Sequence, residues 1–405
     1  MKINYGEENS KLQTLDLYCQ WILEQEYDAG SRGKFLYCGK DTFEWYMIFY
    51  ALRTLSLGGT LLNKPEYIKA AEPYMDLYCG EQLPNGALCS GYRGKPAAKM
   101  TAQEIEDLIR TGNLNLADNG SDCQALVQAA MLTDSPERKE LYLNTVRDWL
   151  DKWVPIWALP DGSYGNGIWG GHKLNATYSC AINVCSALAS YGIVSGDERY
   201  IRNAEGFAAF VCDHTLPDGR PIFFNVYPRV RQFILDDYSH MFYTLEGLCW
   251  THFASRNEEI RTKIEKFLKT WIFGKYGILA CWPKEFNWFN GNYISFWDAT
   301  DKDGNEVESF GMWACPGWKN AKANGIPHLF SYYLKYIGEN EELRDRLERG
   351  SRYLCRPLDA MVNGVMANPR EHYGHYAVQS TGFAGLTIAE TIKPGFVFEL
   401  VKNNK

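Results

Sequence analysis

The stretch LNATYSCAINVCSALASYGIVSG, residues 174–196, contains no Asp, Glu, Lys or Arg. A helix that is apolar on every face has to be buried on every face. We therefore predict an interior helix that starts near Asn175. Residues 123–133 and 376–389 are equally free of charge, and residues 43–52 and 238–255 carry one acid each, Glu44 and Glu246. These segments predict further interior helices.

Charge-rich amphipathic segments alternate with the charge-poor ones. They begin with a Ser or Asn that can cap a helix and with acids that oppose the positive end of the helix dipole, as in Ser135-Pro136-Glu137. We predict outer helices over residues 10–27, 64–80, 136–156, 197–213, 257–274 and 340–356. The predicted inner helices start near Asp41, Asp118, Asn175, Asp236, Pro327 and Tyr376. The alternation predicts six helical hairpins.

Turn-forming sequences follow the outer helices. Examples are Leu83-Pro84-Asn85-Gly86 and Leu159-Pro160-Asp161-Gly162, each followed by a short β-like segment. The hairpins could form an open solenoid or a closed ring. Solenoids favour short, uniform repeats, whereas the connections 80–116 and 273–324 are long and unequal. We therefore expect an all-α protein, an (α/α)6 toroid with short β-hairpin loops at one rim, in one domain spanning residues 1–405.

Composition excludes several classes of protein. The chain has 405 residues and a formal net charge of -7, without a basic stripe that could neutralise nucleic-acid phosphates. No apolar run approaches the ~18 residues of a membrane-spanning helix. The N-terminus has no secretory pattern, and the 12 cysteines include no CxxC pair. We expect a cytoplasmic protein with reduced cysteines and no cofactor, nucleic-acid partner or membrane anchor. Monomer and homo-oligomer stay open.

This repeated architecture, over residues 10–392, resembles the six-hairpin glycosidase superfamily. Within it, the size is similar to that of the unsaturated glucuronyl and rhamnogalacturonyl hydrolases. The resemblance implies that an Asp at the mouth of the ring protonates the double bond of an unsaturated uronic acid, to which water then adds. It also implies a sugar pocket lined by Trp, Tyr and His. The sequence departs from the family at the third inner helix, where Asn175 stands in place of an acid.

Acids at the starts of two inner helices are the candidate catalytic residues. Asp236 and Asp237 precede His240, and adjacent carboxyls in a pocket of low polarity raise one pKa, which suits a general acid. Asp118 and Asp122 are four residues apart and share one helix face, where they could orient water. Two carboxylates on different helices are what glycoside hydrolysis requires. Helix capping is the alternative role for each Asp.

Aromatic and polar residues near the predicted mouth are the candidate sugar ligands. Aromatic rings cover the C–H faces of sugars, while polar groups bind the hydroxyls, and Arg can pair with a substrate carboxylate. The candidate substrate-binding residues are Glu44, Trp45, Trp169, His172, Asn175, Tyr178, Arg229, Arg231, Trp288, Trp313, His372 and His375. We expect no metal site, because His372 and His375 lack the i, i+4 spacing of helical zinc sites. Other aromatic residues, Tyr46, Phe49, Phe242, Tyr243 and Tyr332, are expected to fill the ring.

The sequence predicts a glycoside hydrolase that acts on oligosaccharides, with uronic-acid-containing chains as the expected substrates. Three alternatives stay open. A polysaccharide lyase could use His172, Asn175 and Tyr178 to neutralise a uronate and transfer protons. A toroidal sugar epimerase would use a pair of catalytic His residues, of which His372 and His375 are only a loose echo. A non-catalytic toroid would bind sugar without forming product.

Overall fold

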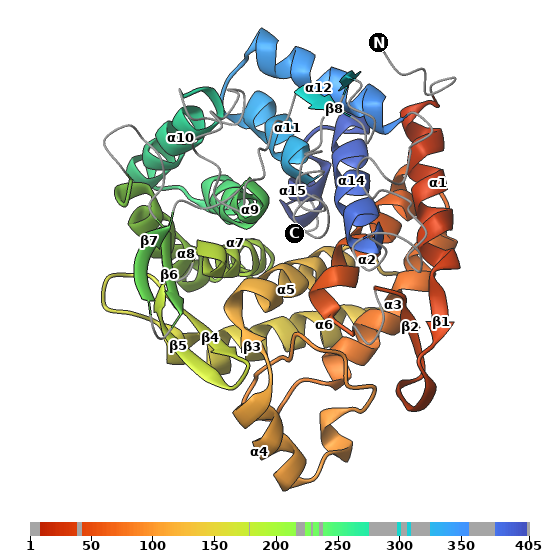
Figure 1. Cartoon of the computed structure of the whole chain (residues 1–405), viewed down its shortest axis with the longest axis vertical. Helices are drawn as coiled ribbons and strands as arrows, with labels where there is room; N and C mark the ends of the chain where they lie inside the picture. The colour runs from red at the N-terminus through yellow and green to blue at the C-terminus, as the bar shows by residue number, and fades with distance from the viewer. Residues whose placement is uncertain are drawn as a thin grey trace.

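The charge-poor helices form an inner ring in the computed structural model (Figure 1). The structure describes residues 9–38, 43–177, 179–215, 223–227, 230–234, 238–274, 298–300, 306–308, 325–355 and 377–402. The inner helices are α2 (Trp45–Leu61), α5 (Leu116–Ala130), α7 (Val184–Ser195), α9 (Tyr238–Ala254), α11 (Ile326–Tyr336) and α14 (Ala377–Ile392). Each contacts the next, and α14 contacts α2, so the ring is closed.

The charge-rich helices form the outer ring and pack against the inner helices. They are α1 (Lys11–Glu24), α3 (Pro65–Gly80), α6 (Pro136–Asp148), α8 (Glu198–Asp213), α10 (Glu258–Phe273) and α12 (Glu341–Leu354). Their first turns are capped as the sequence indicates: Ser135 accepts a hydrogen bond from the Arg138 amide, and Asn257 accepts one from the Glu259 amide. The predicted alternation of inner and outer helices and the all-α toroid are confirmed.

The start of the third inner helix differs from the prediction. Residues that we expected in the first turns of that helix instead belong to strand β5 (His172–Thr177), which pairs with β4 (Gly165–Trp169). Gly170 and Gly171 both have positive φ and form the hairpin turn. A short 3-10 helix, η5 (Ser179–Asn183), then leads into α7. Absence of charge marks a buried segment but does not distinguish a strand from a helix.

Short antiparallel sheets and small helices connect the hairpins. Strand β3 (Leu114–Asn115) pairs with β4 and leads directly into α5. The remaining pairs are β1 (Glu26–Asp28) with β2 (Lys34–Leu36), β6 (Phe223–Tyr227) with β7 (Val230–Ile234), and β8 (Asp298–Thr300) with β9 (Glu306–Glu308). The other small helices are η1 (Gly30–Arg32), η2 (Ala97–Lys99), α4 (Ala102–Thr111), η3 (Trp149–Trp153) and η4 (Val154–Trp157). The predicted turns at Gly86 and Gly162 have positive φ.

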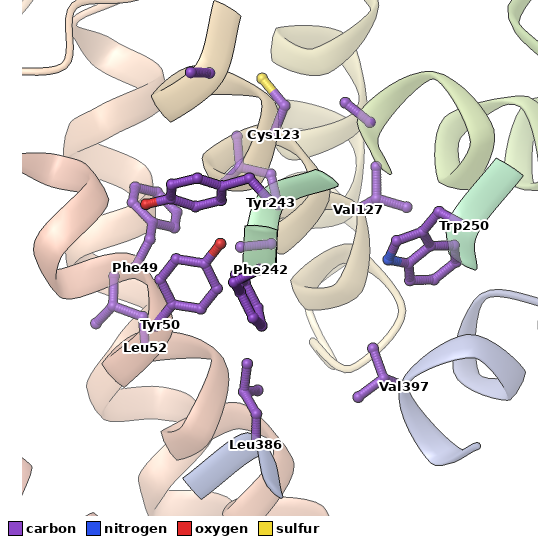
Figure 2. Close-up of a cluster of buried hydrophobic side chains, with 14 of the residues drawn as sticks. Phe49, Tyr50, Leu52, Cys123, Val127, Phe242, Tyr243, Trp250, Leu386 and Val397 are labelled. Atoms are coloured by element: carbon purple, nitrogen blue, oxygen red, sulfur yellow. The ribbon is translucent and has the colours of Figure 1, made fainter. Parts of the chain in front are cut away.

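Aromatic side chains fill the inside of the ring. Tyr50 of α2 packs edge-on against Phe242 of α9 and stacks on Phe383 of α14 with ring centroids 4.0 Å apart. Figure 2 shows Tyr50, Phe242 and Tyr243 beside one another in this interior. Of the five aromatic residues predicted to fill the ring, four are buried and Tyr46 is only half-buried.

One end of the ring is closed by the last described helix, α15 (Phe396–Lys402), which Figure 1 shows near the centre of the ring. The centroid of the Phe398 ring lies 4.5 Å from the ring centroids of Trp250 and Tyr332, both in the later turns of inner helices. Buried Glu390 accepts hydrogen bonds from the amides of Gly395 and Val397 at 2.6 and 2.8 Å. Among the described residues no helix combines the length and apolarity needed to cross a membrane.

Candidate active site

Three carboxyl groups lie at the end of the ring opposite α15. Glu44 is the N-cap residue of α2, Asp118 lies in the first turn of α5, and Asp122 lies one turn further along α5. We call Glu44, Asp118 and Asp122 the mouth carboxyls. They influence one another electrostatically, because the charge of Asp118 raises the pKa of both other groups. Asp118 and Asp122, which the sequence predicts as catalytic acids, therefore lie on the same helix, and Glu44 lies near them.

Asp118 is held in place by a capping residue. Asn115 ends strand β3 and caps α5, and its Oδ1 accepts a hydrogen bond from the Asp118 amide at 2.8 Å. Its Nδ2 donates to Asp118 Oδ2 at 2.7 Å and to Ser90 Oγ at 2.9 Å. The Asp118 side chain is therefore not needed to cap its own helix, since Asn115 does so. Asp118 is 6% exposed, and its Oδ2 atom accepts the hydrogen bond from Asn115 Nδ2.

Asp122 is completely buried, and neither of its carboxyl oxygens has a hydrogen-bond partner among the described residues. Burial, and then the charge of Asp118, raise the pKa of Asp122 well above its ordinary value. The nearby hydroxyl of Tyr78 opposes this shift, although it donates its hydrogen bond to Asn119 Oδ1 at 3.0 Å. An isolated buried carboxylate is very unfavourable, so burial favours the protonated form of Asp122.

Glu44 lies opposite a glycine. The Trp45 amide donates to the Ser90 carbonyl and the Tyr92 amide to the Phe43 carbonyl, which makes Glu44 and Gly91 a non-hydrogen-bonded antiparallel pair. A Cβ at Gly91 would lie 3.9 Å from both Glu44 Oε2 and Arg93 Nη2. Burial, and then the charge of Asp118, raise the pKa of Glu44 to about 7, against the opposing charge of Arg93.

The loop that carries Gly91 and Arg93 is fixed by Glu81. This buried carboxyl accepts hydrogen bonds from the amides of Arg93 and Gly94 at 2.9 and 2.7 Å, and from Trp45 Nε1 at 3.0 Å. Trp45, a predicted substrate ligand, is fully buried and supports this loop instead. We therefore no longer assign it a contact with substrate. An aromatic residue next to a mouth acid looks the same in sequence whether it points into the mouth or the core.

Trp169 and His172 lie at the tip of the β4–β5 hairpin. They are paired across the turn, and both side chains are exposed, Trp169 by 38%. No contact of either residue with the mouth carboxyls is present in the described part of the chain. A sugar-binding role for them stays a prediction.

Most other predicted ligands lie outside the described residues. These are Asp236, Asp237, Tyr178, Arg229, Trp288, Trp313, His372 and His375. For three more only the backbone is described: His240 lies in the first turn of α9, Asn175 lies in β5 and Arg231 lies in β7.

A buried ion pair lies deeper in the ring. Arg53 Nη1 of α2 donates to Glu246 Oε1 of α9 at 2.7 Å, and the Tyr50 hydroxyl donates to Glu246 Oε2 at 3.2 Å. The two charged side chains are 1% and 0% exposed. His328 of α11 has Nδ1 2.6 Å from the Gly325 carbonyl, and burial together with Arg53 lowers its pKa to about 3. This group joins three inner helices but does not include the mouth carboxyls.

Asn115, Gly91, Arg93 and Glu81 were not predicted from the sequence. Asn115 could have been found, because a capping Asn three residues before an acid is a recognisable helix start. The other three lie in the connection between α3 and α5, whose conformation no local pattern indicates.

The comparisons with known proteins agree with this architecture. An inactive α-1,6-mannanase from Salegentibacter sp. HEL1_6 in complex with α-1,6-mannotetrose superposes with a TM-score of 0.59 at 10% identity, covering 94% of this chain and 99% of that one. A family 76 α-mannanase from Bacteroides thetaiotaomicron also gives 0.59, at 11% identity over 95% of this chain and 97% of that one. An unsaturated glucuronyl hydrolase from Bacillus sp. GL1 gives 0.56, at 10% identity over 95% and 98%.

The fold is that of the six-hairpin glycosidases. No protein-family model matches the sequence, and no curated protein is detectably similar to it. The similarity therefore lies in the three-dimensional structure, at identities that establish the fold alone.

Proposed function

We propose that the protein is a glycoside hydrolase that cleaves oligosaccharides at the mouth of its ring. The observation that carries this proposal is Asp118, a carboxyl oriented by Asn115 and accompanied by two further acids at the end of the ring opposite α15. A scaffold protein would have no use for several acids close together in a buried position, because they cost folding free energy.

The proposed mechanism uses two carboxyl groups. One, as a carboxylic acid, gives its proton to the glycosidic oxygen while the C–O bond breaks, and the other, as a carboxylate, takes a proton from the attacking water. Asp118 suits the second role because Asn115 already donates to one of its oxygens. Asp236 or Asp237 is a candidate for the first.

Uronic-acid-containing oligosaccharides are the substrates we favour. Arg93 lies beside Glu44, donates to Cys89 Sγ at 3.1 Å and has no acidic partner within ion-pair distance among the described residues. A guanidinium free of ion pairs can receive a substrate carboxylate. An α-mannan is the second candidate, because mannanases are among the proteins with this fold.

The test is a set of oligosaccharides incubated with the wild type, Asp118→Asn and the surface control Asp107→Asn. Loss of ultraviolet absorbance from unsaturated uronyl oligosaccharides, with new reducing ends, supports the favoured substrate. Release of mannose oligosaccharides supports the second candidate. Asp118→Asn should lose activity on the order of 100-fold or more, and Asp107→Asn should keep it. Formation of new ultraviolet absorbance from saturated polymer would indicate a lyase and contradict the proposal.

A further inference from the structure

We infer that Glu44 is the general acid of this site. Its carboxyl group donates a proton to the substrate, and Asp118 acts as the base. The inference rests on the proposed hydrolase function and names a residue that the sequence suggested only as a substrate ligand. It competes with Asp236 and Asp237 for the role of acid.

The position of Glu44 is the first observation. Glu44 is the N-cap residue of α2, yet its side chain makes no capping hydrogen bond. Its Oε2 atom is buried and has no hydrogen-bond partner in the part of the chain that the structure describes. An Asp, Asn or Ser at this position would satisfy the first turn of the helix. The carboxyl oxygen Oε2 lies beside Gly91 instead, where an added Cβ would be 3.9 Å from it and from Arg93 Nη2.

The space around Glu44 is the second observation. In a non-hydrogen-bonded antiparallel pair the two Cα atoms lie about 4.5 Å apart and the side chains share one face. Gly91 presents no side chain there, and an added Cβ would meet no atom closer than 3.6 Å. A methyl group at position 91 would therefore fit in ordinary van der Waals contact with Glu44 Oε2 and Arg93 Nη2, which places both of these atoms beside Gly91.

The contrast between Glu44 and Asp118 gives the roles. Asp118 accepts hydrogen bonds, which suits an ionised carboxylate, whereas Glu44 has no hydrogen-bond donor directed at Oε2. The charged and titratable groups near Glu44 are Asp118 and Asp122 from α5, Arg93 from the connecting loop, and Cys38. Burial and Asp118 outweigh Arg93, so the pKa of Glu44 is about 7. Two carboxyls in different environments mark the acid and the base of a site.

The step balances with water as the only other reactant. Glu44 gives its proton to the glycosidic oxygen, the C–O bond breaks with its electron pair going to that oxygen, and water adds to the anomeric carbon. Asp118 accepts the proton released by the water. Transfer of that proton back to Glu44 through solvent restores both groups.

The experiment compares Glu44→Gln with Glu390→Gln. Glu390 is a matched control because its pKa is also raised to about 7 by burial, and it lies at the far end of the ring. Wild-type kcat/KM should fall as the pH rises through about 7, because the acid then loses its proton. We call this fall the alkaline limb of the pH profile. Glu44→Gln should lose this limb and about 100-fold or more of kcat on unactivated oligosaccharides. It should lose much less on a nitrophenyl glycoside, whose leaving group needs no proton. Glu390→Gln should keep the limb.

A second variant guards against a folding defect in Glu44→Gln. Gly91→Ala places a methyl group against Glu44 Oε2 and Arg93 Nη2 and should raise KM while leaving the pH limb in place. The inference is overturned if Glu44→Gln, folded by circular dichroism, keeps the limb and its activity. If Asp118→Asn and Asp237→Asn abolish activity while Glu44→Gln does not, the hydrolase proposal stands and only this inference fails. If the wild type hydrolyses no oligosaccharide, the proposed function fails.

Discussion

Asn115 is the residue on which the geometry of the site depends most. Its side chain caps α5, orients Asp118 and reaches Ser90 in the loop that carries Gly91. One short amide thus connects the strand β3, the helix α5 and the mouth of the ring. Its loss should therefore affect catalysis more than stability.

We predict that Asn115→Ala lowers the free energy of unfolding by about 1 kcal/mol and lowers kcat by at least ten-fold. Ser135→Ala is the control, because Ser135 caps α6 in the same way but lies on the outer ring. Urea unfolding and steady-state kinetics measure both effects. If Asn115→Ala and Ser135→Ala lose the same stability and both lose only a little kcat, a positioning role for Asn115 is contradicted.

The chemistry of single residues could be predicted only in part. Asp118 and Asp122 follow from their place at the start of a charge-poor helix. Glu44 carries no signal that separates it from Glu81, although one lies free at the mouth and the other binds three N–H groups. The difference arises from the path of the 81–101 connection, which tertiary contacts determine.

Pairs of elements are joined by polar contacts as well as by packing. The Arg53–Glu246 ion pair connects α2 with α9 across the ring, and Tyr50 adds a hydrogen bond to the same carboxylate. Both charges are buried, so each depends on the other to offset its lost hydration. This pair helps to fix which faces of the two helices turn inward.

Arg53→Met should destabilise the protein by about 3–5 kcal/mol, because Glu246 is left as an uncompensated buried charge. The double variant Arg53→Met/Glu246→Leu should recover most of this loss. Equilibrium unfolding in urea measures both. A double variant that is less stable than Arg53→Met would contradict the explanation.

The elements themselves are largely predictable from the sequence. Charge-poor and charge-rich segments gave the inner and outer helices because burial on all faces excludes charge. The start of α7 was misplaced, since the Gly170–Gly171 turn directs an uncharged segment into β5. Helix α4 was missed although Thr101 and Glu104 form a capping box. Helix α4 lies in the long connection between α3 and α5, so the alternation of inner and outer helices does not predict it.

The whole molecule is a ring with two different ends. The mouth carboxyls lie at one end, and α15 closes the other through Phe398, Trp250 and Tyr332. Under the proposed function, an oligosaccharide would reach the mouth carboxyls from the end of the ring that α15 does not close. Helix α15 should therefore contribute to stability and leave the chemistry unchanged.

Phe398→Ala should lower the free energy of unfolding by about 3–5 kcal/mol through the cavity it creates. Lys402→Ala, on the same helix but exposed, should change it by less than about 0.5 kcal/mol. The pH profile of kcat/KM should be the same in both variants and in the wild type. A shifted profile in Phe398→Ala would mean that the closed end participates in catalysis.

The central claim is that water, activated at Asp118, cleaves a glycosidic bond at the mouth of the ring. The most direct measurement is oligosaccharide cleavage in water labelled with heavy oxygen, followed by mass spectrometry, for the wild type and for Asp118→Asn. The account predicts one labelled oxygen in the product for each bond that the wild type cleaves, at a rate that falls by about 100-fold or more in the variant. Unlabelled products, or an Asp118→Asn variant as active as the wild type, would contradict it.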